Sequence, residues 1–90
     1  MTVKFVSTYN DLVEVATEIL YTIDPASTYC NENDMFDEYE NEAALIAEYF
    51  IKENMMLKRA VFRAFDKQFD GHCDEAKLNE AYRKINEYLV

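Results

Sequence analysis

The sequence predicts an all-α fold, a compact four-helix domain with a short N-terminal extended arm. Its 90 residues include one glycine and one proline, Gly71 and Pro25, so strong helix breakers are few. Residues that favour helices are plentiful elsewhere, and apolar side chains recur every three or four positions in four segments. A chain of this length supports one hydrophobic core, so we predict a single domain over residues 1–90.

The first helix is predicted to follow an N-cap at Ser7 or Thr8 and to run to about residue 23. Thr8 and Asp11 have the spacing of a capping box. The Asp24-Pro25 pair ends the helix, because the residue before a proline avoids the helical conformation. The predicted inward stripe consists of Leu12, Ala16, Ile19, Leu20 and Ile23.

The second helix is predicted to begin at Asp34, after a connecting loop at residues 24–33. Asp34 is the expected N-cap, and Asp37 and Glu38 in the first turn lie near the positive end of the helix dipole. The predicted inward stripe is Phe36, Tyr39, Ala43, Ile46, Ala47 and Phe50.

The third helix is predicted to begin near Asn54 and to end around Phe69, before Gly71. Asp74 is the expected N-cap of a fourth helix that continues to the C-terminus. Residues 2–6 form the extended arm, with no second strand to pair with. The inward stripes are Leu57, Ala60, Val61, Ala64 and Phe65 in the third helix, and Leu78, Ala81, Tyr82, Ile85 and Leu89 in the fourth.

Charge is divided unequally along the chain. Residues 1–51 contain eleven acidic residues and one basic residue, and residues 52–90 contain seven acidic and eight basic residues. The net charge of -9 therefore divides into -10 for the first segment and +1 for the second. With a pI near 4.4, the chain repels phosphate backbones and anionic lipid surfaces, so we predict no binding to nucleic acid or membranes. The expected partner is a cationic protein.

Acidic residues are densest between positions 32 and 42, where six fall within eleven residues. Two or three acids suffice to stabilise a helix start, so we assign the excess to recognition of a partner, with aromatic side chains as anchors. The alternative is structural, with the acids at a helix start and two aromatic side chains partly in the core. The predicted partner-binding residues are Tyr29, Asp34, Phe36, Asp37, Glu38, Tyr39, Glu40 and Glu42.

No catalytic site, cofactor or metal site is predicted, and the chain is not expected to be an enzyme. His72 and Cys73 are adjacent, but neighbours in a loop point apart. One histidine and two distant cysteines give no zinc-binding spacing. The N-terminal segment lacks the apolar run of a secretory signal, so we expect a cytoplasmic protein with Cys30 and Cys73 as free thiols.

Residues 66–77 resemble the calcium loop of an EF-hand. Acids occupy positions one, five and nine, and Gly71 stands at position six. Gln68 replaces the acid at position three, and Lys77 replaces the glutamate that closes the shell, so we expect no physiological calcium binding. A degenerate EF-hand-like, calcium-responsive regulatory domain is kept as an alternative function.

Basic residues recur every four positions in the third helix, at Arg59, Arg63 and Lys67. Such a stripe could contact nucleic acid. The favoured interpretation is pairing with an antiparallel second helix, each exposed pair contributing about 0.2–1 kcal/mol. The expected acidic partners are Glu38, Glu42 and Glu48.

An Asp24-Pro25 stop and an Asp37-Glu38-Tyr39 run with Glu42 occur in the first half of the chain. In these residues the chain resembles an uncharacterised family of small helical bacterial proteins. That resemblance implies a compact helical fold and no agreed activity. The shared residues also have a structural interpretation, as a helix stop and as partners of a helix dipole.

In size, acidity and lack of catalytic groups, the chain is similar to immunity proteins of bacterial toxin systems, including contact-dependent growth inhibition. This similarity implies an immunity protein that binds and neutralises a cationic toxin domain, with a nuclease as the favoured class. We expect a monomer before the complex forms. The alternative from the same binding class is a phage-encoded nucleic-acid mimic that inhibits a host defence protein.

Overall fold

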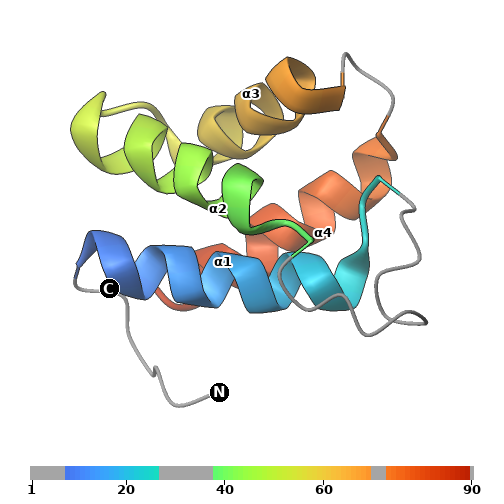
Figure 1. Ribbon diagram of the computed structural model, residues 1–90, viewed down its shortest axis with the longest axis horizontal. Helices are drawn as coiled ribbons and strands as arrows, with labels where there is room; N and C mark the ends of the chain where they lie inside the picture. The colour runs from blue at the N-terminus through green and yellow to red at the C-terminus, as the bar shows by residue number, and fades with distance from the viewer. Residues whose placement is uncertain (1–7, 27–37, 70–72, 90) are drawn as a thin grey trace.

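The computed structural model describes residues 8–26, 38–69 and 73–89 (Figure 1). These segments contain α1 (Tyr9–Ile23), α2 (Glu40–Ala47), a π-helical turn η1 (Glu48–Lys52), α3 (Leu57–Phe69) and α4 (Glu75–Asn86). The described part of the chain has no strand, so the predicted all-α, four-helix class is confirmed. The predicted extended arm at residues 2–6 lies outside the described residues.

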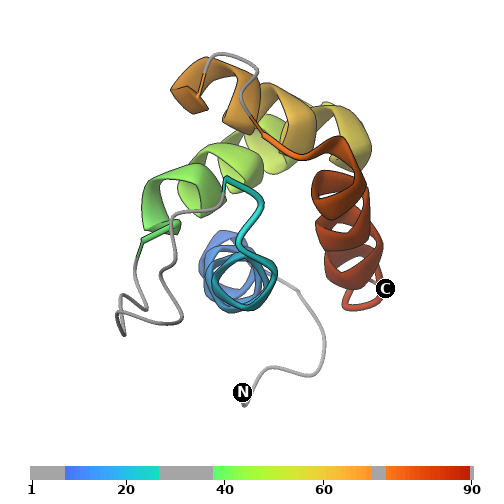
Figure 2. The same ribbon diagram turned by 90° about the vertical axis from the view of Figure 1, so that its right-hand side faces the viewer.

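The four helices form a closed ring of neighbours. Helix α1 packs against α2 and α4, and α3 completes the ring by contacting the same two helices. Figure 2 shows α1 end-on, with α4 beside it and α3 across the core. The radius of gyration is 11.8 Å, so the domain is compact. Large side chains that are fully buried between the helices include Leu12, Leu20, Tyr39, Ile46, Phe65 and Ile85.

Both ends of α1 lie where the sequence predicts them. The Thr8 side chain accepts a hydrogen bond from the backbone N–H of Asp11 at 3.1 Å, which satisfies one of the free donors of the first turn. Asp24 ends the helix in the left-handed conformation, with φ of 53° and ψ of 62°. Its N–H still donates to the Leu20 carbonyl, at 2.8 Å.

The predicted start of α2 is wrong. The helix begins at Glu40, after a turn at residues 38–39, and its N-cap residue Tyr39 makes no side-chain capping bond. The Tyr39 side chain turns into the core, where its hydroxyl donates to Asp24 Oδ1 and accepts from the Ala26 N–H at 3.0 Å. This contact with the end of α1 sets the start of α2, whereas the predicted cap at Asp34 lies outside the described residues.

Helix α2 continues into η1, and Asn54 then ends it. The Glu53 N–H donates to the Glu48 carbonyl five residues earlier, at 3.2 Å, and Asn54 has a φ of 55°. Asparagine is one of the few residues that tolerate this left-handed conformation. The prediction that the third helix begins near Asn54 is therefore wrong, and α3 begins at Leu57.

The π turn also changes which side chain of this segment is buried. Tyr49 is buried, whereas Phe50, which the predicted stripe contains, is only half-buried. A π turn adds one residue to the helical repeat, so side chains after it are rotated relative to a regular α-helix. The end of α3 at Phe69 agrees with the prediction.

Helix α4 begins as predicted and ends earlier than predicted. Asp74 Oδ1 accepts hydrogen bonds from the backbone N–H groups of Ala76 at 2.9 Å and Lys77 at 3.3 Å. The Asp74 N–H donates to the Pro25 carbonyl at 3.2 Å, which ties the start of α4 to the end of α1. The helix ends at Asn86, and within the described residues no helix has both the length and the apolar composition needed to span a bilayer.

Candidate functional site

A groove of about 400 Å³ lies between α1 and α2. Its lining residues follow one flank of each helix, since positions three and four apart on a helix share a face. We call it the acidic groove; it is lined by Tyr9, Asn10, Val13, Glu14, Thr17 and Glu18 from α1, and by Glu40, Asn41 and Ala44 from α2.

The acidic groove combines three carboxylates with an apolar floor. Glu14 and Glu40 are exposed and Glu18 is half-buried, and the lining contains no basic residue. The Thr17 hydroxyl donates to the Val13 carbonyl at 2.7 Å, so this buried polar group is already satisfied within α1. The groove therefore offers negative charge above a surface of small and apolar side chains.

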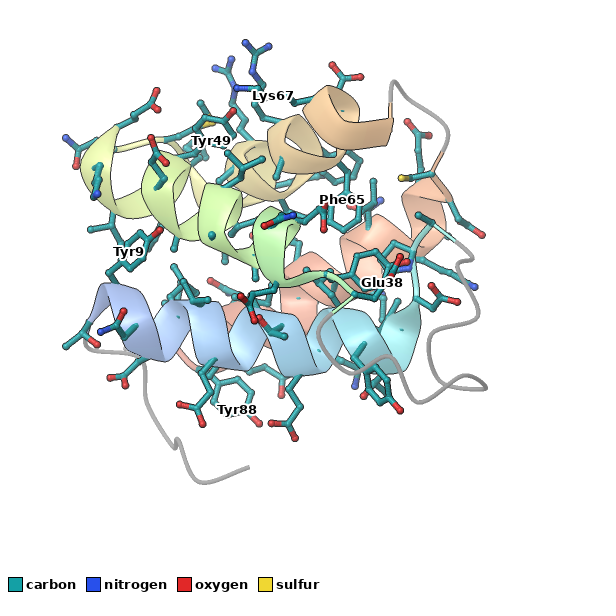
Figure 3. The ribbon with its side chains drawn as sticks, in the orientation of Figure 1. Tyr9, Glu38, Tyr49, Phe65, Lys67 and Tyr88 are labelled. Atoms are coloured by element: carbon teal, nitrogen blue, oxygen red, sulfur yellow. The ribbon has the colours of Figure 1, made fainter. Side chains whose placement is uncertain are left out.

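Tyr9 lines the acidic groove, and the ammonium group of Lys52 lies over its ring. Figure 3 shows Tyr9 reaching from the start of α1 toward α2. Its hydroxyl donates to the Ala44 carbonyl at 3.4 Å, and Lys52 Nζ lies 5.1 Å from the ring centroid. An ammonium at this distance is attracted by the electron-rich face of the ring. The Tyr9 ring is thus placed where it can meet a positive charge.

The structure separates the predicted partner-binding residues into three groups. Tyr29, Asp34, Phe36 and Asp37 lie outside the described residues. Glu40 lines the acidic groove, and Glu38 is half-buried in the turn before α2. Tyr39 and Glu42 are buried.

Two of the predicted contacts are therefore corrected. The Tyr39 side chain has no exposed surface, and its ring packs against Phe65 with the centroids 5.7 Å apart. The Glu42 side chain is 5% exposed. Neither side chain can reach a partner in this conformation, because α2 turns this face toward the core.

Glu42 is an unusual member of the core. Its Oε1 atom is shielded from solvent and has no hydrogen-bond partner among the described residues. Burial raises the pKa of the Glu42 carboxyl above its ordinary value; an interaction with its own backbone amide lowers the pKa by less, and the charge of Glu38 adds to the increase. Burial therefore makes the carboxyl of Glu42 harder to ionise in the folded protein than in the unfolded chain.

Cys73 lies within the electrostatic reach of Glu42. Burial raises the pKa of the Cys73 thiol, and the negative charge of Glu42 raises it further. Cys73 is a free thiol, as predicted, and Cys30 lies outside the described residues. A raised pKa keeps the thiol protonated and less nucleophilic, so this environment does not resemble that of a catalytic cysteine.

Two residues of the acidic groove, Glu14 and Glu18, are absent from the predicted site. They follow Asn10 at intervals of four, so a polar stripe on α1 could have indicated them. The predicted site instead follows the denser acids after residue 31. The groove appears only when α1 and α2 are placed side by side.

Helices α3 and α4 occupy both ends of the EF-hand-like stretch at residues 66–77, and residues 70–72 of it lie outside the described residues. A calcium loop of this type needs twelve residues, but α3 continues through Phe69 and α4 begins at Glu75. Asp66 is therefore an exposed helical residue, and Asp74 uses its carboxylate to cap α4. Within the described ranges no three histidine, cysteine or acidic side chains gather as a metal-binding group.

The predicted ion pairs between α2 and α3 do not form. Among the described residues, no ion pair joins the basic stripe at Arg59, Arg63 and Lys67 to the acids of α2 and η1. Glu42 cannot contribute, because it faces inward and the basic side chains are exposed.

Comparison of the chain with protein-family models, curated proteins and solved structures finds no match. The resemblance to the small helical family therefore stays a prediction. The residues that carry it have a structural connection, since Tyr39 of one motif bonds to Asp24 of the other. This contact favours the structural interpretation of the two motifs.

Proposed function

We propose that this protein binds a cationic protein through the acidic groove and thereby neutralises a toxin domain, with a nuclease as the favoured class. The observation that carries the proposal is the lining of the groove, in which two helices supply Glu14, Glu18 and Glu40 and no basic residue. A lysine or arginine of the partner fits this surface. Its aliphatic stem can pack on Val13 and Ala44 while its charge meets the carboxylates.

Net charge supports fast capture of such a partner. The chain carries -9 overall, and residues 1–51, which contain α1 and α2, carry -10. A field of this kind raises association rates by about 10- to 1,000-fold and makes them depend on salt. Nuclease substrate clefts are basic, so an acidic groove can occupy or border such a cleft in place of nucleic acid.

Tyr9 is the proposed aromatic anchor, in place of the buried Tyr39. Tyrosine is enriched among the interface residues that contribute most to binding. The Lys52 ammonium over its ring illustrates the contact that a partner cation would make. Neutralising Lys52 with methionine would remove the competing cation and strengthen binding.

Reversing the three groove acids tests the proposal. The triple variant E14K/E18K/E40K should slow association with a basic nuclease domain encoded beside the gene by at least about tenfold, and it should weaken the salt dependence. Stopped-flow fluorescence at several salt concentrations measures both quantities. Nuclease assays with equimolar protein measure neutralisation.

A matched control separates the groove from net charge. Glu48, Glu53 and Glu87 are exposed and lie outside the lining, so E48K/E53K/E87K makes the same change in charge elsewhere. The control should slow association much less than the groove variant does. Equal slowing by the two variants would show that the partner does not use the groove.

A further inference from the structure

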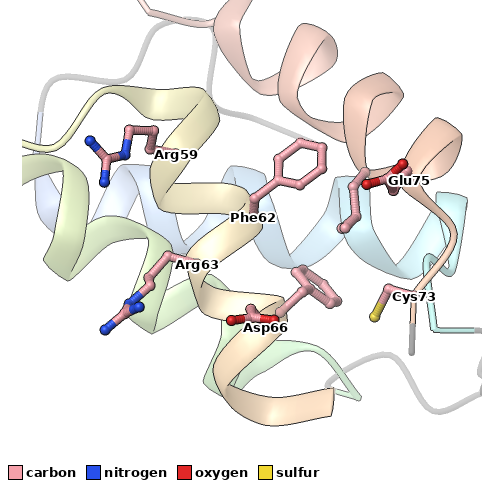
Figure 4. A pocket seen from close by; sticks show the side chains of 8 residues that line it. Arg59, Phe62, Arg63, Asp66, Cys73 and Glu75 are labelled. Atoms are coloured by element: carbon pink, nitrogen blue, oxygen red, sulfur yellow. The ribbon is translucent and has the colours of Figure 1, made fainter. Parts of the chain in front are cut away.

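A second pocket, of about 330 Å³, lies between α3 and α4 (Figure 4). Its apolar surface comes from Phe62, Phe65 and Leu78, of which Phe65 and Leu78 are buried and Phe62 is half-buried. An engineered apolar cavity of about 150 Å³ holds a benzene molecule. The α3–α4 pocket therefore has room for a bicyclic aromatic group.

Two arginines also contribute to the lining of this pocket. Arg59 and Arg63 line the pocket one helical turn apart on α3, with Phe62 between them in the sequence. Both are exposed, and neither forms an ion pair within the described residues. Figure 4 shows both side chains extending away from Cys73 and Glu75. Arginine binds carboxylates through two parallel hydrogen bonds, so this end of the pocket suits an organic anion.

Of the two acidic residues of the pocket, Glu75 lies at the end away from the arginines, whereas Asp66 follows Arg63 by three positions on α3. Glu75 is in the first turn of α4, where its charge stabilises the positive end of the helix dipole. Glu75 and Asp66 would repel an anion placed beside them, whereas Cys73 presents a protonated thiol because burial raises its pKa. Packing and helix capping therefore leave three charges of the pocket unexplained, and the two arginines outnumber the one acid, Asp66.

We propose that the α3–α4 pocket binds a small aromatic carboxylate. The carboxylate lies at Arg59 and Arg63, and the rings lie against Phe62 and Leu78. The site is separate from the acidic groove, and it does not depend on the proposed function.

Three naphthalene compounds test the choice of ligand, because they share the same ring system and differ in the charge of the substituent. NMR titrations of the ¹⁵N-labelled chain would use 2-naphthoate, 2-naphthylmethanol and 2-naphthylmethylammonium. The carboxylate should bind about tenfold more tightly than the alcohol, and the ammonium more weakly than either. Amide shifts should centre on Phe62, Cys73 and Leu78.

Two double variants test the position of the anion. R59Q/R63Q should abolish the preference for 2-naphthoate and leave the affinity for the alcohol unchanged, which shows that the pocket is intact. K58Q/K67Q removes the same charge from exposed residues of α3 outside the lining, and it should leave all three affinities unchanged. The proposal is overturned if the ammonium binds as tightly as the carboxylate, if the preference survives R59Q/R63Q, or if the shifts map elsewhere.

Discussion

Replacing Glu42 with glutamine should stabilise the protein at neutral pH. Glu42 is 5% exposed, and the Oε1 atom of its carboxyl group has no hydrogen-bond partner among the described residues. Burial, together with the charge of Glu38, raises the pKa of Glu42. A raised pKa means that the fold favours the protonated form. The contribution of Glu42 to stability is therefore largest below its ordinary pKa of 4.5, and this contribution falls as pH rises through the raised pKa.

The expected gain in stability follows from the Oε1 atom of Glu42, which has no hydrogen-bond partner among the described residues. A buried polar group without a partner costs about 1–3 kcal/mol, and a charged group costs more. Glutamine at position 42 keeps the shape and removes the charge, but it retains a polar oxygen, so we expect a gain at the low end, of about 1 kcal/mol at pH 8. For a domain of this size that gain raises Tm by about 4–8 °C. Near pH 4 the carboxyl is protonated, so the gain should disappear.

Thermal unfolding followed by circular dichroism at pH 4, 6 and 8 provides the assay. E40Q is the matched control, because Glu40 is exposed on the same helix and undergoes the same change in charge. The E40Q variant should lower stability by no more than about 0.5 kcal/mol. The change is a loss because Glu40 lies near the positive end of the α2 dipole. A lower Tm for E42Q than for wild type at pH 8 would refute the reasoning, since the ionised carboxylate would then be stabilising the fold.

Three further substitutions test individual contacts by urea unfolding. Y39F removes a hydroxyl that donates one hydrogen bond and accepts another, so it should cost about 1.5–3 kcal/mol, whereas Y82F on a half-buried tyrosine should cost much less. N54A should cost about 1–2 kcal/mol because alanine is unfavourable at positive φ, and N54G should cost little. D74A should cost about 0.5–2 kcal/mol by removing the N-cap of α4, and an unchanged unfolding midpoint would show that the cap is dispensable.

The helix ends that sequence analysis locates correctly depend on local contacts. Thr8 and Asp74 bond to backbone groups two or three residues away, so a short stretch of sequence contains all the partners. Asp24 ends α1 beside a proline, which is also a local constraint. These helix ends can be predicted from sequence because they depend on no contact with a distant residue.

The start of α2 could not be predicted in the same way. The acids near its predicted start favour a helix there, but the Tyr39 hydroxyl bonds to Asp24, fifteen residues earlier, and its ring packs on Phe65. Tertiary contacts of this kind outweigh the small local preferences of a helix terminus. The π turn at residues 48–52 is a comparable case, because one extra residue per turn leaves little trace in an apolar pattern.

The acidic groove was only partly predictable. Glu40 belongs to the segment that composition singles out, but Glu14 and Glu18 belong to α1, where they look like ordinary surface residues. Their significance depends on α2, which runs antiparallel to α1 (Figure 1). Helix α2 adds the carboxylate of Glu40 to the same groove. Sequence spacing identifies a face of one helix, but it does not identify the helix that lies opposite.

The charge excess that is free for docking is smaller than composition suggests, because the fold uses part of it. Asp11 lies in the first turn of α1, Asp24 accepts a hydrogen bond from Tyr39, and Glu42 is buried. The exposed carboxylates of the acidic groove are Glu14 on α1 and Glu40 on α2, above an apolar floor. Such a surface is more selective than diffuse charge, because a partner must present a cation of the right length at one place. Specific slowing by the groove variant, compared with its charge-matched control, is therefore the result that distinguishes recognition from simple electrostatic attraction.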